Sequence, residues 1–278
     1  MTNLRVIDLE EDNSEERFLS SLLETGFAVL RNHPLDPVLV KSIYKHWMAF
    51  FLSSEKEHFS YDKKTQDGFF SLSDAESAKG QQEKDLKEYF HFYTWGRCPQ
   101  DLREELLLYL NSALDFAVTL LSWIDRYLKD QAIGDRKQSL ADMVLDSQLN
   151  LLRILRYPPI RGDENAFRAA PHEDINLITI LPMSDSMGLE ILDQNNSWVP
   201  IKGDCDHLIV NIGDMLHEIT AGIFPSATHR VLSPTGSSMN YSRMSLPLFV
   251  HPRPNVVLSD RHTAASYLNE RLNDLGVV

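Results

Sequence analysis

The chain contains 278 residues, of which 43% are hydrophobic, and its formal net charge is −13 at pH 7. Its 40 acidic residues outnumber its 27 basic residues, which argues against a nucleic acid or an anionic membrane as a partner and favours a small-molecule substrate. A chain of this length and apolar content can bury a full core, and we expect one domain.

The cellular setting is predicted from cysteines and from the N-terminus. Only two cysteines occur, Cys98 and Cys205, far apart in the sequence, which argues against a disulfide framework and fits a reducing compartment. Residues 1–13 are acidic and lack the pattern of a signal peptide, and no uninterrupted apolar run approaches the ~18 residues of a membrane span. We therefore predict a cytoplasmic protein, whereas the oligomeric state is not indicated by the sequence.

Helix signals dominate the first half of the chain, residues 1–148. Asn13 and Glu16 have the spacing of a capping box, and Gly26 is placed to end that helix. Asp36 and the proline that follows it are typical of a helix start. The elements predicted here are strands over 4–9, 27–31 and 87–93, and helices over 13–26, 36–51, 101–129 and 140–145.

The segment from 60 to 87 is polar and charged, broken by Gly68-Phe69-Phe70. Long stretches without secondary structure are uncommon inside a compact domain and are often functional. We expect this segment to be either mobile or a cover over a site.

Short apolar runs separated by turn signals follow from residue 149, without intervening helices, which predicts a mainly β core over 149–251. A final helix is expected over 263–275, within a C-terminal segment of residues 252–278. The predicted strands are 149–157, 175–181, 188–192, 198–201, 207–211, 215–219, 229–232 and 241–250, with a hairpin loop at 193–197 and turns at 213–214 and 235–236.

The residues that organise this core are His172 and Asp174. Side chains alternate in an extended segment, so both point to one face while Glu173 points to the other. With an imidazole from a neighbouring strand they would form the two-histidine, one-carboxylate face that holds Fe(II) and leaves positions open. A His-x-Asp tripeptide occurs about once by chance in such a chain, and a surface turn is the simple alternative. Candidates for the third ligand are His207, His217, His229 and His251.

Motifs spread over nearly the whole chain resemble the isopenicillin N synthase-like family of Fe(II)- and 2-oxoglutarate-dependent oxygenases. Each motif is weak alone, but their order along the chain matches the family's. The matching segments are Gly26–His33, Gly68–His91, Leu152–Pro159, His172–Asp174, Gly188–Leu192, Trp198–Ile201, Val210–Leu216, His229–Val231 and Arg243–Ser245.

This resemblance implies a mainly β fold with flanking helices, namely a distorted double-stranded β-helix of the jelly-roll, cupin-like type. It implies Fe(II), 2-oxoglutarate and O2 as cofactor and cosubstrates, and oxidation of a small organic substrate by hydroxylation, desaturation or ring closure, with release of succinate and CO2. The implied metal ligands are His172, Asp174 and His229, and the implied residues for the far carboxylate of 2-oxoglutarate are Arg243, Ser245 and Tyr157.

Some residues depart from the family pattern, and the roles of others are not decided by the sequence. Leu155 replaces an asparagine common in relatives, and His217 occupies a predicted strand position that is often polar or apolar instead. His91 is either a buried structural histidine or a substrate contact, and the final helix either packs or closes over the site. The alternatives to the main prediction are a 2-oxoglutarate-independent oxidase or cyclase of the same family, and a non-catalytic jelly-roll binding protein.

Overall fold

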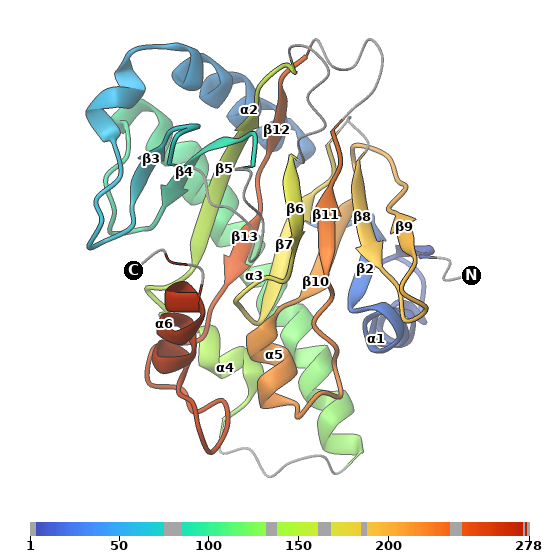
Figure 1. The fold of residues 1–278 in the computed structure, drawn as a ribbon. Helices are drawn as coiled ribbons and strands as arrows, with labels where there is room; N and C mark the ends of the chain where they lie inside the picture. The colour runs from blue at the N-terminus through green and yellow to red at the C-terminus, as the bar shows by residue number, and fades with distance from the viewer. Residues whose placement is uncertain are drawn as a thin grey trace.

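The computed structural model describes residues 4–74, 85–131, 138–160, 168–184, 188–233, 241–274 and 276. Within these ranges two β-sheets lie at the centre, and helices surround the larger one (Figure 1). The protein is therefore mainly β with flanking helices, as predicted. The turn predicted at 235–236 and the part of the polar segment between 75 and 84 lie outside the described residues.

The larger sheet has the strand order β1-β2-β10-β7-β13-β5-β4-β3, and β12 also pairs with β5. The smaller sheet has the order β6-β11-β8-β9. All pairings are antiparallel except that of β1 with β2. The strands are β1 (Val6–Asp8), β2 (Phe27–Arg31), β3 (Gly68–Phe70), β4 (Glu88–Phe92), β5 (Leu151–Tyr157), β6 (Ala169–His172), β7 (Ile178–Pro182), β8 (Leu189–Leu192), β9 (Trp198–Pro200), β10 (Leu208–Ile212), β11 (His229–Val231), β12 (Arg243–Ser245) and β13 (Leu248–Val250).

Apolar side chains from both sheets form one buried cluster, in which Phe27 and Ile209 of the larger sheet meet Ile191 and Val231 of the smaller one. Burying these side chains fixes how the sheets lie against each other, because each residue contributes about 1.5–3 kcal/mol when fully removed from water. The small sheet carries β6 and β11, so this packing sets the position of both histidine-bearing strands.

A larger core lies between the big sheet and its helices. Trp47 of α2 is fully buried and contacts the rings of Phe50, Phe51 and Phe90, so the aromatic side of this helix belongs to the core. The helical elements are α1 (Ser14–Thr25), α2 (Pro37–Leu52), the 3-10 helix η1 (Glu55–Phe59), α3 (Gln100–Asp130), α4 (Leu140–Val144), α5 (Asp214–Ile219) and α6 (Ala264–Asp274).

By length and composition α3 could cross a membrane, and among the described helices it alone meets both criteria. Its most apolar 18-residue window is 44% buried inside the protein. Leu110, Ala117 and Ile124 are fully or almost fully buried on that side and belong to the core. The apolar side of α3 is thus already covered by α2, α4 and the sheet.

Three predicted elements differ in the structure. Residues 215–219 form helix α5 and not a strand, so His217 lies on a helix; a short apolar run fits a buried strand and a buried helical turn equally well. The strand predicted over 241–250 is split at Leu246-Pro247 into β12 and β13, because proline has no N–H for a ladder. Residues 68–70, predicted to interrupt a loop, form β3 and pair with β4.

The predicted helix caps agree with the structure at one helix start and not at the others. The Asp36 carboxylate accepts a hydrogen bond from the Val38 N–H at 2.8 Å, as predicted. Asn13 precedes α1 but its side chain makes no capping hydrogen bond, and α3 begins at Gln100, one residue ahead of the predicted start at 101. Asn13 and Asp36 are both residue types that can cap a helix, but only Asp36 has the extended backbone geometry that brings its side chain to an N–H.

This difference gives a matched test. Asp36→Ala should lower the free energy of unfolding by about 1 kcal/mol, because a true N-cap bond is lost. Asn13→Ala should change it by less than about 0.5 kcal/mol. Urea unfolding of both variants measures the two values, and equal losses would contradict the assignment of the caps.

Candidate metal centre

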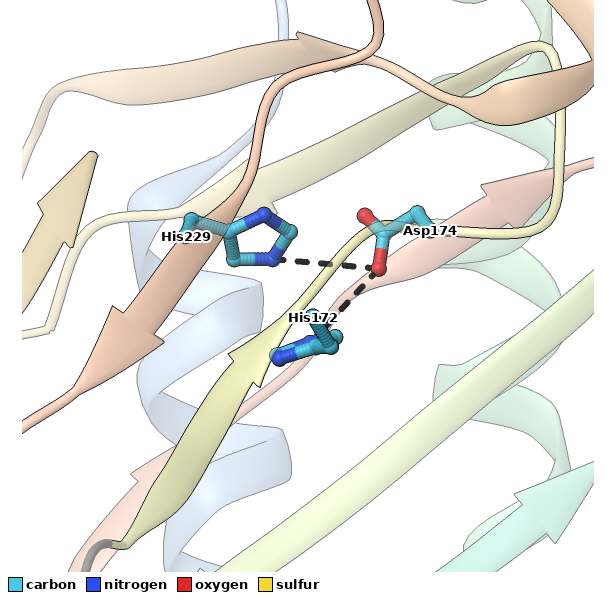
Figure 2. Close-up of side chains that lie close together, drawn as sticks. All are labelled: His172, Asp174 and His229. Atoms are coloured by element: carbon cyan, nitrogen blue, oxygen red, sulfur yellow. Dashed lines mark ion pairs between the residues drawn. The ribbon is translucent and has the colours of Figure 1, made fainter. Parts of the chain in front are cut away.

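Three possible metal ligands meet at one end of the small sheet (Figure 2). His172 ends β6 and His229 begins β11, and the two residues are register partners in this antiparallel pair. Asp174 follows β6 by two residues and points back at both rings. Its Oδ1 lies 3.9 Å from His172 Nε2 and 3.8 Å from His229 Nε2, and all three ligand atoms lie within 4.8 Å of one another. This spacing can hold one metal ion on three sides.

Backbone carbonyls fix which nitrogen of each histidine faces this point. His172 Nδ1 lies 2.8 Å from the Ala170 carbonyl, and His229 Nδ1 lies 3.0 Å from the Ala227 carbonyl. A carbonyl can only accept, so each Nδ1 carries the hydrogen and each Nε2 keeps its lone pair. Hydrogen bonds of this kind orient metal-binding histidines and set their tautomer.

The Asp174 carboxylate is held by its other oxygen. Oδ2 accepts hydrogen bonds from Thr179 Oγ1 at 2.6 Å and from Asn211 Nδ2 at 2.8 Å. Thr179 Oγ1 in turn accepts from Asn176 Nδ2 at 2.8 Å. With Oδ2 fixed, Oδ1 is turned towards the two imidazoles.

Electrostatics keep the site ready for a cation. Burial raises the pKa of Asp174, but the two histidines and the Thr179 and Asn211 hydrogen bonds outweigh it, and the net pKa lies below its ordinary value. Burial and the neighbouring His229 lower the pKa of His172 to about 4. The apo site thus holds a carboxylate and a neutral His172 imidazole at physiological pH, which is the state that binds a metal.

A tight turn supports Asp174 from below. The Gly213 N–H donates to the Leu177 carbonyl at 3.0 Å, and the Asp214 N–H donates to the Asp174 carbonyl at 2.8 Å. A Cβ at Gly213 would lie 2.1 Å from Asn176 Oδ1 and 2.4 Å from the Asn176 carbonyl. Only glycine allows the start of α5 to approach the ligand-bearing loop this closely.

The predicted cosubstrate residues lie on β5 and β12, where Arg243 is the register partner of Tyr157 and Ser245 of Leu155. All four are buried. Arg243 Nε donates to Ser184 Oγ at 2.9 Å, and the guanidinium lies 5.5 Å from the centre of the Tyr157 ring. Arg243 Nη1 is buried and has no hydrogen-bond partner among the described residues. A buried donor of this kind costs free energy unless a ligand accepts from it.

A narrow cavity of about 70 Å³ joins the two groups of residues. The described residues around it include the triad and the three cosubstrate candidates, so both groups of predicted residues line one cavity. Leu155, which replaces the asparagine of relatives, adds an apolar patch to this cavity. A carboxylate at Arg243 and a metal ion at the triad would therefore lie at opposite ends of one small space.

A wider pocket of about 460 Å³ opens beside the triad. His91 and His251 line it, whereas His207 and His217 line neither this pocket nor the narrow cavity. The His91 Nδ1 lies 2.8 Å from the Gln66 carbonyl, and its Nε2 accepts from Arg153 Nε at 2.9 Å. Both ring nitrogens of His91 thus have protein partners.

Two further sequence alternatives concern Glu173 and the last helix. Glu173 accepts a hydrogen bond from Thr228 Oγ1 at 2.9 Å and does not face the triad's shared point. Burial, with the hydrogen bond and charge of Glu173, raises the pKa of Asp214 to about 7. Arg271 of α6 lies 3.4 Å from Asp214, which ties the last helix to the rim of the wider pocket.

Comparisons with known proteins agree with this geometry. A family model described as the 2OG-Fe(II) oxygenase superfamily matches residues 148–252, and one described as the N-terminal region of non-haem dioxygenases in morphine synthesis matches residues 4–111. A solved Shewanella oneidensis protein classed as an oxygenase is 48% identical, with a TM-score of 0.89 and full coverage of both chains. The chain belongs to the 2OG-Fe(II) oxygenase superfamily.

More distant relatives extend this result. The rice protein 2-oxoglutarate-dependent dioxygenase 11 (Oryza sativa subsp. japonica) is 27% identical over 91% of this chain and 73% of its own length. A Neurospora crassa protein solved in complex with alpha-KG is 19% identical and shares the fold, with a TM-score of 0.79 over 97% of this chain and 95% of that chain.

Membership in this superfamily confirms several predictions. The fold is a double-stranded β-helix, and the protein is a non-haem Fe(II)- and 2-oxoglutarate-dependent dioxygenase that oxidises small substrates. The non-catalytic binding protein and the 2-oxoglutarate-independent oxidase are not supported.

The donor set suits the cofactors of the 2OG-Fe(II) oxygenase superfamily. Two imidazole nitrogens and one carboxylate oxygen on one face match non-haem Fe(II), and the absence of a cysteine among them argues against a structural zinc site. Arg243 Nη1, which is buried and has no hydrogen-bond partner among the described residues, is a charged donor of the kind that suits a carboxylate.

Sequence analysis missed the residues that hold the ligands in place, namely Thr179, Asn211, Asn176, Gly213, Ser184 and Arg168. Arg168 is 1% exposed and lies 5.7 Å from the Tyr157 ring, on which Arg243 also packs. The sequence did offer one sign of these supporting residues: polar side chains inside otherwise apolar strands. Thr179 stands in Ile-Thr-Ile and Asn211 in Val-Asn-Ile. A buried polar side chain requires a hydrogen-bond partner, so such residues are expected to support a neighbouring polar group.

Thr179→Val tests the support of Asp174. The change removes one hydrogen bond to Oδ2 and keeps the shape of the side chain, so the affinity for Fe(II) or Co(II) should fall about 10- to 100-fold. Anaerobic titration of the apo protein gives the affinity. Thr119→Val, which removes a hydroxyl bonded to the Asp115 carbonyl on the exposed side of α3, is the control. An unchanged metal affinity in Thr179→Val would contradict the role of this hydrogen bond.

A pH test follows from His251, which is buried and whose pKa is lowered to about 4 by that burial. Its ordinary pKa is about 6.5, so the unfolded chain binds a proton between these values while the folded chain does not. Stability should therefore fall as pH falls from about 6.5 to 4. Between pH 7 and pH 4.5 the free energy of unfolding of His251→Gln should therefore fall by about 2 kcal/mol less than that of the native protein. Urea unfolding at both pH values measures this free energy for the two proteins. Equal decreases in the native protein and in His251→Gln would contradict a neutral, buried His251.

Proposed function

We propose that His172, Asp174 and His229 hold the Fe(II) of this oxygenase, and that Arg243, Ser245 and Tyr157 bind the far carboxylate of 2-oxoglutarate. One observation carries the assignment. Two Nε2 atoms and Asp174 Oδ1 converge on one point in the narrow cavity, and Arg243 lines the same cavity with a buried Nη1 that has no hydrogen-bond partner among the described residues.

The bound iron and 2-oxoglutarate supply the oxidising chemistry, in which O2 is consumed, succinate and CO2 are released and the substrate is oxidised. The protein's own residues supply orientation. His172, Asp174 and His229 would hold the metal through two imidazole nitrogens and one carboxylate oxygen, a donor set that suits non-haem Fe(II). The Arg243 guanidinium is a planar, permanently charged fork that matches a carboxylate in two hydrogen bonds.

Ser245 and Tyr157 complete this carboxylate site. Ser245 is two residues from Arg243 on the same strand, so both side chains face the cavity. Tyr157 presents a phenol from the neighbouring strand without adding a charge. The buried setting strengthens each of these hydrogen bonds, because little water competes for the donors.

The substrate is proposed to bind in the wider pocket, which His172 lines and where its side chain is more exposed than those of Asp174 and His229. A volume of about 460 Å³ fits a small organic molecule. We further propose that this substrate is neither a nucleic acid nor a membrane lipid and that the protein acts in the cytoplasm, as its charge of −13 and its two free cysteines favour.

Separate variants test the two ends of the cavity. His172→Ala should abolish tight Fe(II) binding. Arg243→Met should raise the KM for 2-oxoglutarate about 100-fold and leave Fe(II) affinity almost unchanged, because it removes a buried charge-assisted contact worth about 3 kcal/mol. Succinate formation at varied 2-oxoglutarate measures KM, and Arg31→Gln, an exposed strand arginine paired with Asp8, is the control. The proposal would be contradicted if His172→Ala left the Fe(II) affinity unchanged, or if Arg243→Met left the KM for 2-oxoglutarate unchanged.

A further inference from the structure

The strand that carries His172 is irregular immediately before this residue. The register of β6 against β11 shifts between residues 169 and 172, so that Ala170 and Pro171 together stand opposite Arg230. Such a bulge interrupts the ladder locally, and proline has no N–H to donate. In addition, β6 is the end strand of the small sheet. The pairing with β11 alone therefore gives the backbone before His172 little support.

A side chain from a distant part of the chain supplies a further hydrogen bond at this point. Asp85 Oδ1 accepts from the Ala170 N–H at 3.0 Å. The carbonyl of the same alanine lies 2.8 Å from His172 Nδ1, from which it accepts. Ala170 thus connects the two side chains, because its N–H is held by the carboxylate and its carbonyl orients the imidazole.

Asp85 is itself held by Lys87. The Lys87 Nζ lies 2.8 Å from Asp85 Oδ2, and the Lys87 N–H donates to the Asp85 carbonyl at 2.9 Å. Both residues are buried. A buried carboxylate is costly unless it is paired and hydrogen-bonded. One oxygen is used for the ammonium group, and the other is directed to the Ala170 N–H.

This contact joins the two sheets beside the triad. Asp85 and Lys87 come just before β4 of the large sheet, whereas Ala170 belongs to β6 of the small sheet. Asp85 lines the wider pocket, and Lys87 lines both the wider pocket and the narrow cavity. The end of the polar segment 60–87 therefore reaches the strand that carries a proposed metal ligand.

We infer that Asp85 is a positioning residue for His172, which it holds through the Ala170 N–H, and that Lys87 holds Asp85 in turn. This inference rests on the proposed function, in which His172 binds the metal. The alternative is an ion pair that stabilises the fold and does not affect metal binding. Positioning requires an acceptor for the Ala170 N–H, whereas the ion pair requires the two charges.

Two changes at position 85 separate these roles when both are made in Lys87→Met protein, where the ion pair is already absent. Asparagine and leucine are similar in size, but only asparagine offers an oxygen to the Ala170 N–H. With Asp85→Asn the Co(II) affinity should stay within about threefold of the native value, whereas with Asp85→Leu it should fall about tenfold or more. Anaerobic titration of the apo protein, followed by the visible absorption of bound Co(II), measures both affinities.

Asp125→Leu is the control for general destabilisation. The Asp125 carboxylate accepts from the Leu140 and Ala141 N–H groups at the start of α4, and it lines neither the narrow cavity nor the wider pocket. This change should lower the free energy of unfolding, measured with urea, and leave the Co(II) affinity unchanged. If the protein with Asp85→Leu does not fold, Asp85→Ala in the same background takes its place with the same expectation.

Equal Co(II) affinities for Asp85→Asn and Asp85→Leu in the Lys87→Met background would overturn the inference. So would a fall in affinity in Asp125→Leu as large as that caused by Asp85→Leu. Failure of the proposed function is recognised separately, because His172→Ala would then leave the Co(II) affinity unchanged, and the inference would fall with it. An affinity that depends on His172 but is the same for both changes at position 85 would refute the positioning role alone.

Discussion

The site depends on how the two oxygens of one buried carboxylate are used. Asp174 Oδ2 is held by Thr179 and Asn211, so Oδ1 is left facing the Nε2 atoms of His172 and His229. Without the hydrogen bonds to Oδ2 the carboxylate could rotate, and Oδ1 would no longer converge with the two Nε2 atoms on one metal position. The hydrogen bonds also stabilise the ionised carboxylate in a buried position, where an unpaired charge would be costly.

The fold supplies these contacts from separate layers. Thr179 and Asn211 come from β7 and β10 of the large sheet, which are register partners, whereas the two histidines come from the small sheet. Apolar packing between the sheets therefore sets the distance from the carboxylate's support to the imidazoles. The same architecture explains the second end of the cavity, since β5 and β12 bring Tyr157 and Arg243 opposite each other. The candidate metal and anion sites are thus set mainly by strand pairing, and the start of α5 adds a hydrogen bond from the Asp214 N–H to the Asp174 carbonyl.

Much of this was predictable from sequence because the chemistry requires particular side chains at short spacings. His172 and Asp174 are two residues apart, and the resemblance to the oxygenase family pointed to His229 and to Arg243 and Ser245. The supporting residues were harder to predict, because Thr179, Asn211 and Gly213 act across strand pairings that local patterns do not encode. Helix α5 was wrongly predicted as a strand for a related reason: its short apolar run is shaped by the glycine turn under Asp174, which is a tertiary contact. The hydrogen bond from Arg153 to His91 shows the same limit, since the two residues are 62 apart in the sequence.

The most direct test of the account is an anaerobic crystal structure with Fe(II) and 2-oxoglutarate bound. It should show the iron bonded to Nε2 of His172, Nε2 of His229 and Oδ1 of Asp174, with Thr179 and Asn211 still on Oδ2 and the far carboxylate of 2-oxoglutarate on Arg243. Iron held elsewhere, or through Asp174 Oδ2 or a histidine Nδ1, would contradict it.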